Sequence, residues 1–186
     1  MTLPLVVILA LLFGNAGHHQ SSAKSTSPSA LPALTPTAPP SNAAAVAPCT
    51  KVLEALPEQL GDLLPRVVHP KPDSLFVVAW GDPAVILRCG VARPADLKIG
   101  SSVEFVLVGG SSGQSGAYFD VGTDHGSNVF TTVDRAVYIS VTVPAKYASG
   151  PLPALAQAIA KALPPVCVGA PEPGLTDDSK LCTHRH

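Results

Sequence analysis

The stretch WGDPAVILRCG, residues 80–90, combines a turn, an apolar run, an arginine and a cysteine. The Gly-Asp-Pro sequence at 81–83 predicts a turn, because proline fixes its own φ angle and extends the residue before it. Residues 84–89 predict a strand, whose alternate side chains face opposite sides of a sheet. The side chains that suit a core are Val85, Leu87 and Cys89, and those on the other side are Ala84, Ile86 and Arg88. The stretch therefore predicts a hairpin strand with one buried face.

Four other segments have the composition of strands, and they lie on both sides of this one. In residues 136–143, valine and isoleucine alternate with polar side chains, which is typical of a strand with one face in the core. The remaining three segments are 74–80, 103–107 and 128–132.

Two segments show the spacing of amphipathic helices, one before the strands and one after them. Leucines recur at helical intervals from Leu53 to Leu64, and Pro57 breaks or restarts the helix because proline lacks a backbone donor. Residues 151–163 repeat the pattern, and Pro164 ends it. The order helix, strands, helix predicts an α+β domain, with an antiparallel sheet of four to five strands and two helices on one face.

The N-terminal residues 2–13 form an apolar run that is shorter than the roughly 18 residues needed to span a bilayer. This length suits the apolar core of a signal peptide, and the small residues Gly14 and Ala16 suit a cleavage site. No Lys or Arg precedes the run, so a membrane anchor is the alternative. Residues 1–16 therefore predict an extracytoplasmic protein, either secreted or held by a single N-terminal anchor in the cell membrane.

Residues 17–48 are rich in Ser, Thr, Pro and Ala and contain one charged residue, Lys24. A segment of this composition cannot bury enough apolar surface to offset the entropy of ordering it. It predicts a disordered linker before a globular domain at 49–168. Residues 169–186 are polar and rich in Pro and Gly, and we expect a flexible C-terminal tail.

Four cysteines in an exported chain predict disulfides, and four allow three pairings. Two helices on one face of a sheet can bring their outer ends together. We therefore expect Cys49, which opens the first helix, to pair with Cys167, which follows the second. This leaves Cys89 to pair with Cys182, and the alternative is that both of these are thiols.

The composition argues against several classes of partner and cofactor. Lys+Arg number 12 and Asp+Glu 13, without a basic stripe, so a nucleic acid partner is not expected. No CxxC pair is present, and the histidine clusters lie in the linker and the tail, so no metal is expected. These clusters are His18–His19 and Cys182–His186. No glycine-rich phosphate loop leads into a helix, so no cofactor is expected.

The sequence Gly109–Gly113 matches the G-x-S-x-G pattern of hydrolases, with Ser111 in the place of the nucleophile. That pattern requires a sharp turn into a helix, whereas the residues that follow are too rich in glycine to begin one. His125 stands beside Asp124 in a turn-like sequence, and turn chemistry accounts for both. We therefore expect no catalytic residue in either place.

Arg88 needs a partner, because arginine is rarely buried unpaired. The acids expected near it are Asp82, in the preceding turn, and Asp134, before the strand at 136–143. Trp80 can cover the guanidinium with its ring. These four residues form either a cluster that locks the turn or the lining of a shallow ligand groove.

Between residues 48 and 168 the chain resembles an uncharacterised family, the domain of unknown function 3515. The most specific matches are Trp-Gly-Asp-Pro and Arg-Cys-Gly within Trp80–Pro94. Weaker matches are Cys49, Leu56–Pro57, Thr131–Arg135, Val141–Pro144 and Cys167. The resemblance implies an exported or membrane-anchored actinobacterial envelope protein without an assigned activity. Family members usually carry a cysteine in the middle strand, and residues 101–121 lack it.

Together these features favour an exported cell-envelope protein that is a non-catalytic binding or assembly module, with an unidentified envelope component as its partner. The alternative is an envelope hydrolase that uses Ser111 or His125. A third hypothesis is a subunit whose partner lies in the membrane.

Overall fold

The computed structural model describes residues 31–97, 105–109 and 116–166. The chain divides into two units, Met1–Leu31 and Pro32–His186, and the described helices and strands all belong to the second. Within the described ranges, no helix is long and apolar enough to cross a membrane. Several predictions concern residues outside these ranges, namely the apolar segment (1–16), Ser111, Cys167, Cys182 and the C-terminal segment (169–186).

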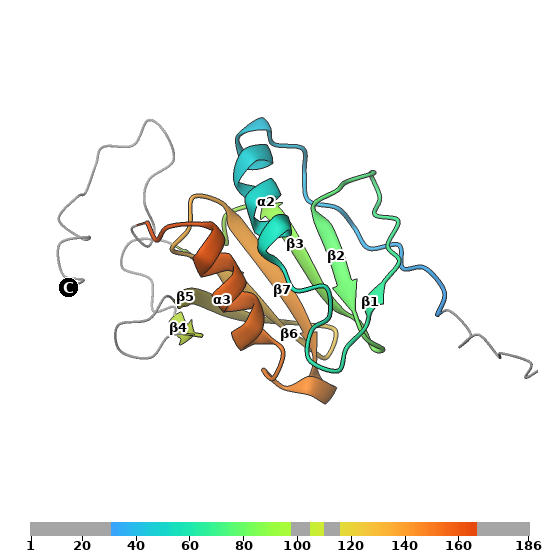
Figure 1. Ribbon diagram of the computed structural model, residues 1–186. Helices are drawn as coiled ribbons and strands as arrows, with labels where there is room; N and C mark the ends of the chain where they lie inside the picture. Colours follow the sequence, from blue (N-terminus) through green and yellow to red (C-terminus); the bar gives the residue numbers. More distant parts are fainter. Residues whose placement is uncertain (1–30, 98–104, 110–115, 167–186) are drawn as a thin grey trace, which may run out of the picture. The chain divides into compact units, whose positions relative to one another are not determined.

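The described chain forms an antiparallel sheet of seven strands in the order β1-β2-β3-β7-β6-β5-β4 (Figure 1). β2 and β3 form a hairpin through the Gly-Asp-Pro turn, while β4 to β7 form a meander whose last strand pairs with β3. The strand bounds are Pro65–Arg66 (β1), Val77–Trp80 (β2), Val85–Val91 (β3), Phe105–Val108 (β4), Ala117–Asp124 (β5), Ser127–Thr132 (β6) and Tyr138–Pro144 (β7).

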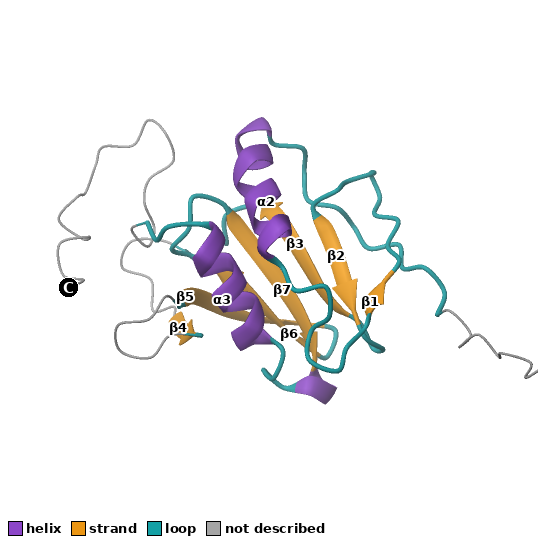
Figure 2. Ribbon diagram, in the orientation of Figure 1, coloured by secondary structure: helices purple, strands orange, loops and turns teal. Residues whose placement is uncertain are grey.

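Two α-helices, α2 (Ala43–Ala55) and α3 (Leu152–Ala162), lie over the same face of the sheet and contact each other (Figure 2). α2 packs on β3, and α3 packs on β4 and β5. A short 3-10 helix, Ala145–Tyr147, leads out of β7. The predicted α+β class, with an antiparallel sheet and two helices, is confirmed.

The prediction of four to five strands is wrong, because two of the seven strands have weak sequence signals. β1 has only two residues and includes Pro65, which is tolerated at a sheet edge. β5 includes Asp120, Gly122 and Asp124, residue types that are depleted in strands. It is held in the sheet by pairing with β6 along its length from Phe119 onward.

Regular structure begins before Cys49, so the prediction of a disordered linker over residues 17–48 does not hold for residues 43–48, which lie in α2. α2 begins at Ala43, where the side chain of Asn42 caps the first turn by accepting a backbone hydrogen bond. The helix ends at Ala55, and Leu56 has an extended backbone. Proline disfavours a helical conformation in the residue before it, so Pro57 accounts for this end.

Residues 32–38 run alongside residues 67–71 and exchange backbone hydrogen bonds with them in the parallel direction. The Leu34 N–H donates to the Val67 carbonyl at 2.9 Å, and the His69 N–H donates to the Leu34 carbonyl at 2.7 Å. These bonds use main-chain groups that every non-proline residue carries, so side-chain composition does not reveal them.

β3 has one buried face and one half-buried face, as its alternation predicts. Val85, Leu87 and Cys89 are fully buried in the core under the helices. Ile86 and Arg88, on the opposite face, are half-buried. The strand therefore contributes to the core with one face and leaves the other for polar contacts.

Gly90 allows α2 to lie close to β3. Its φ angle is 88°, in the left-handed region that favours glycine, and the β3–β7 register shifts between Cys89 and Val91. A Cβ atom at position 90 would lie 3.2 Å from the Ala45 Cβ and 3.7 Å from the Cys49 Sγ, both in α2. A larger residue here would have to push the helix away or strain the backbone.

We expect Gly90→Ala to lower the free energy of unfolding by about 1–3 kcal/mol, because it combines an unfavourable φ angle with a close contact. Urea unfolding measures this. The matched control is Gly122→Ala in β5, where an added Cβ meets no atom within 4 Å, and where we expect a change of less than about 0.5 kcal/mol. Equal effects of the two substitutions would contradict the role given to Gly90.

Candidate functional site

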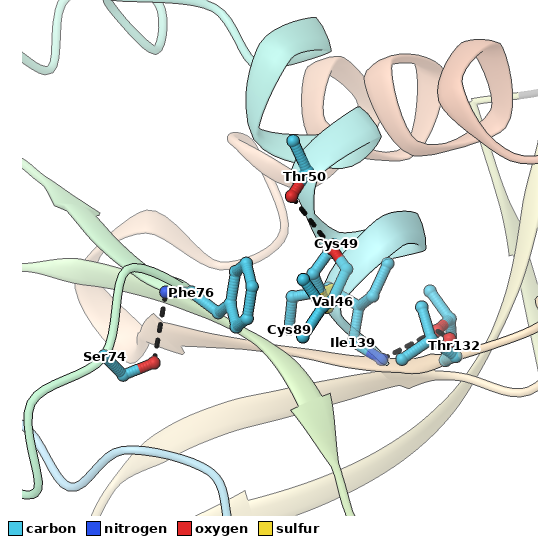
Figure 3. Close-up of a disulfide and its surroundings, with 9 residues drawn as sticks. Val46, Cys49, Thr50, Ser74, Phe76, Cys89, Thr132 and Ile139 are labelled. Atoms are coloured by element: carbon cyan, nitrogen blue, oxygen red, sulfur yellow. Dashed lines mark hydrogen bonds between the residues drawn. A yellow bond between two sulfur atoms is a disulfide. The ribbon is translucent and has the colours of Figure 1, made fainter. Parts of the chain in front are cut away.

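Cys49 of α2 and Cys89 of β3 form a disulfide, with Cα atoms 5.6 Å apart and both residues fully buried beside Phe76 (Figure 3). The predicted pairs Cys49–Cys167 and Cys89–Cys182 are therefore wrong. The prediction placed Cys49 at the outer end of its helix, whereas it lies in the middle of α2, directly over β3. The bond is a structural link between the helix layer and the sheet.

The sheet separates Trp80 from Arg88. Trp80 lies opposite Val85 in the hairpin, on the helix-covered face, and its indole N–H donates to the Glu58 carbonyl at 3.1 Å. Arg88 is three positions after Val85 in the same strand, so it lies on the other face. The predicted stacking of the Trp80 ring on the Arg88 guanidinium is therefore wrong.

The two acids expected beside Arg88 have other arginine partners. Asp82 lies 3.6 Å from Arg66, and its side chain is 65% exposed, so this pair contributes little to stability. Asp134 forms a buried ion pair with Arg135, in which Asp134 Oδ2 lies 2.8 Å from Arg135 Nη1. The predicted partnerships of Arg88 with these acids are wrong.

The Asp134–Arg135 pair has a structural role at the start of β5. The Tyr118 N–H donates to Asp134 Oδ1 at 3.0 Å, and Arg135 Nη2 donates to the Gly116 carbonyl at 2.6 Å. The Val166 N–H, after α3, donates to the Asp134 carbonyl at 2.9 Å. The pair thus joins three separate parts of the chain, and both side chains are almost fully buried, so they do not line a solvent-facing groove.

A row of four polar side chains crosses the face of the sheet opposite the helices. The sheet register places Arg88 of β3 opposite Ser140 of β7, Ser140 opposite Thr131 of β6, and Thr131 opposite Asp120 of β5. Directly opposed residues in antiparallel strands lie on one face with their Cβ atoms about 5 Å apart. We call these four residues the polar row.

Arg88 begins the polar row and is held in place from two sides. Its Nε donates to the Thr37 carbonyl at 3.0 Å, and its Nη1 donates to the Thr142 hydroxyl at 3.0 Å. Burial lowers the pKa of the Arg88 guanidinium, and the Asp124 carboxylate partly offsets this effect. Arginine nevertheless stays charged at any pH in the working range, so the row has a fixed cation at one end.

The two hydroxyls in the middle of the polar row make no hydrogen bond to any other described residue. Ser140 is only 8% exposed, and Thr131 is half-buried. Neither hydroxyl oxygen is a fully buried atom that lacks a partner, so both remain accessible to solvent. These two groups can therefore bond to a molecule from outside the chain.

Asp120 ends the polar row, and its surroundings disfavour its charge. Desolvation by burial and repulsion from Asp96 raise the pKa of the Asp120 carboxyl above its ordinary value of 3.8, while the Val121 N–H acts in the opposite direction.

The candidate catalytic groups do not form a site among the described residues. His125 occupies the β5–β6 turn at a φ angle of 45°, and its side chain is 96% exposed and 3.5 Å from the Asp124 carboxylate. Ser111 lies outside the described residues. Across the described ranges, no group of three or more His, Cys, Asp or Glu side chains is arranged to hold a metal ion.

Three members of the polar row were not predicted from the sequence. Ser140 was visible on the polar side of the strand at 136–143, but its neighbours across the sheet were not. Thr131 and Asp120 become its neighbours only through the pairing of β5 with β6 and of β6 with β7. The alternation of each strand shows which residues share a face, and the register decides which of them meet.

The fold and its site define a class of disulfide-linked α+β domain with helices on one face of the sheet and a polar row on the other. The chain belongs to the family described as protein of unknown function (DUF3515), whose model matches residues 1–167. No curated protein and no solved structure matches the chain. The resemblance seen in the sequence is thereby confirmed at the level of the family.

We expect Asp120→Asn to stabilise the protein slightly at neutral pH. Because the folded-state pKa of Asp120 is raised, the wild-type protein loses stability as the pH rises from 3.8 through that higher value, and asparagine removes this loss. Melting temperatures should be measured from about pH 3.5 to about pH 7. We expect the two proteins to melt at similar temperatures at the acidic end, and the variant to melt at the higher temperature as the pH rises toward 7. A variant that is less stable than wild type at neutral pH would contradict this account of Asp120.

Proposed function

We propose that this protein is an exported, non-catalytic binding module of the cell envelope, and that its ligand contacts the polar row. The observation that carries the proposal is the alignment of Arg88, Ser140, Thr131 and Asp120 across four neighbouring strands. The two hydroxyls between the charged ends have no described partner, and the face that carries them is not the one covered by α2 and α3.

The dimensions of the polar row suit an extended polar ligand. Three strand spacings separate β3 from β5, which gives about 14 Å between the backbones that carry Arg88 and Asp120. A ligand of that length can accept from Arg88, exchange hydrogen bonds with both hydroxyls and donate to Asp120. Strands provide these contacts from a rigid surface, so little ordering is needed on binding.

Two features support a location outside the cytoplasm. The Cys49–Cys89 disulfide links the two layers of the fold, and such bonds persist in oxidising compartments. The apolar run at residues 2–13 has the length of a signal-peptide core. Both features suit an envelope protein.

Binding is favoured over hydrolysis by the surroundings of His125. A general base must lie within hydrogen-bonding reach of the group it deprotonates, and must be held in one orientation. His125 extends into solvent from a tight turn, with Asp124 as its described contact. The polar row provides hydrogen bonds and charge, but within the described chain it includes no histidine, cysteine or lysine.

The test is the retention of the purified protein on the cell-envelope fraction of its source organism. We expect the double variant Ser140→Ala with Thr131→Val to lose about tenfold in affinity, since each hydroxyl contributes about 0.5–1.5 kcal/mol when it bonds to a ligand. Thr123→Val, on the same sheet but on the opposite face in β5, is the control and should bind as wild type does. Melting curves establish that all three proteins are folded.

Unchanged retention of the folded double variant would contradict a role for the polar row. A serine-directed probe that labels the wild-type protein but not Ser111→Ala would contradict the non-catalytic function and favour the hydrolase.

A further inference from the structure

A second and separate surface is an apolar groove of about 330 Å³ at the β1 edge of the sheet. It lies between the end of α2 and the strands β1 and β2. Its lining is aliphatic or aromatic except for two charged residues. The lining residues are Leu53, Leu56, Pro57, Glu58, Pro65, Arg66, Val68, Val78, Ala79 and Trp80.

The groove exists because β1 leaves β2 after two residues. Pro65 and Arg66 pair with β2, but the chain then turns away and pairs with residues 32–38 instead. Val68 and Val78 therefore line a gap in the sheet rather than forming a cross-strand pair. Leucines near the end of α2 border the gap from the helix side.

Arg66 lines this groove, and one of its hydrogen-bond donors has no partner. Its side chain is 7% exposed, its Nη1 donates to the Gly81 carbonyl at 2.8 Å, and its Nη2 donates to the Pro32 carbonyl at 2.8 Å. The Nε is buried and has no hydrogen-bond partner. A buried donor without an acceptor costs free energy that a ligand with an oxygen atom can recover.

We propose that this groove binds the acyl chain of a membrane lipid, with a carboxyl or ester oxygen accepting the Arg66 Nε–H. The lining calls for a ligand that is mostly apolar and presents an acceptor. A peptide segment would also bring several N–H donors, whereas the Glu58 carbonyl at the groove already accepts one hydrogen bond from the Trp80 indole. An acyl chain brings an apolar tail, and its carboxylate or ester group brings acceptor oxygens without an N–H donor.

The course of the chain supports a lipid from the membrane, a step that rests on the export proposed above. Arg66 donates a hydrogen bond to the carbonyl of Pro32, which is the first residue of the second unit. In the sequence, residues 14–31 separate Pro32 from the apolar run at 2–13. A chain of that length spans at most about 60 Å, so in an anchored protein Pro32 stays within that distance of the membrane. Leu64 and Val67, on either side of β1, are 63% and 62% exposed and extend the apolar surface.

The experiment measures binding of three probes to the delipidated full-length protein by calorimetry, below their critical micelle concentrations. The probes are dodecanoate, monododecanoylglycerol and dodecylammonium, which share a chain length, while dodecylammonium has no acceptor oxygen. We expect dodecanoate and monododecanoylglycerol to bind. We expect dodecylammonium to bind at least about tenfold more weakly, because its ammonium group is a cation and a donor like the Arg66 guanidinium.

Two variants and one control connect binding to the groove. Val68→Glu places a carboxylate at a half-buried position in the lining of the groove. We expect it to lower the affinity for both oxygen-bearing probes at least about tenfold. Arg66→Lys keeps the positive charge but has no Nε–H, and we expect a loss of roughly tenfold. Val121→Glu, at a 42% exposed position in β5 outside the groove, should bind as wild type does.

Failure of both oxygen-bearing probes to bind the wild-type protein would overturn the proposal. So would equal binding of dodecylammonium, or equal losses in Val121→Glu and the groove variants. The double variant of the polar row should bind dodecanoate normally. Loss of envelope retention in that variant, with no acyl binding in wild type, would therefore reject the groove and leave the proposed function standing.

Discussion

The contact between α2 and β3 determines how the rest of the domain is arranged. It combines the Cys49–Cys89 disulfide with Gly90, where an added side chain would meet the helix. The two cysteines are 40 residues apart, and a bond that closes such a loop stabilises the fold by about 4 kcal/mol in the chain-entropy account. β1, β2 and the apolar groove all lie within this loop. β7 pairs with the other side of β3, so the same contact positions the meander of β4 to β7.

The stretch at residues 80–90 serves both sides of the sheet. Trp80, Val85, Leu87 and Cys89 enter the core on the helix side, while Arg88 faces the opposite way and begins the polar row. Arg88 also binds the Thr37 carbonyl, and in that way it helps to hold the segment before α2. The stretch is therefore architectural on one face, and in our proposal its other face contributes to recognition.

Local sequence signals predicted the elements and their faces well, and predicted their long-range partners poorly. The helix α3, five of the strands and the buried side of β3 follow from spacing that each segment carries by itself. The leucine spacing at residues 53–64 misplaced the first helix, which runs from Ala43 to Ala55 and does not restart after Pro57. The Cys49–Cys89 pair, the partners of Asp82 and Asp134, and the polar row depend on strand order and register, which bring distant residues together. The pairing of residues 32–38 with 67–71 was missed for a related reason, since main-chain bonds leave little trace in composition.

Peptide mapping of the native protein under non-reducing conditions tests the central contact most directly. If α2 is fixed on β3 as described, mass spectrometry will find a linked pair of peptides that contain Cys49 and Cys89. A linked pair that joins Cys49 to Cys167, or a native protein in which Cys49 and Cys89 are both thiols, would contradict the arrangement of the helix on the sheet.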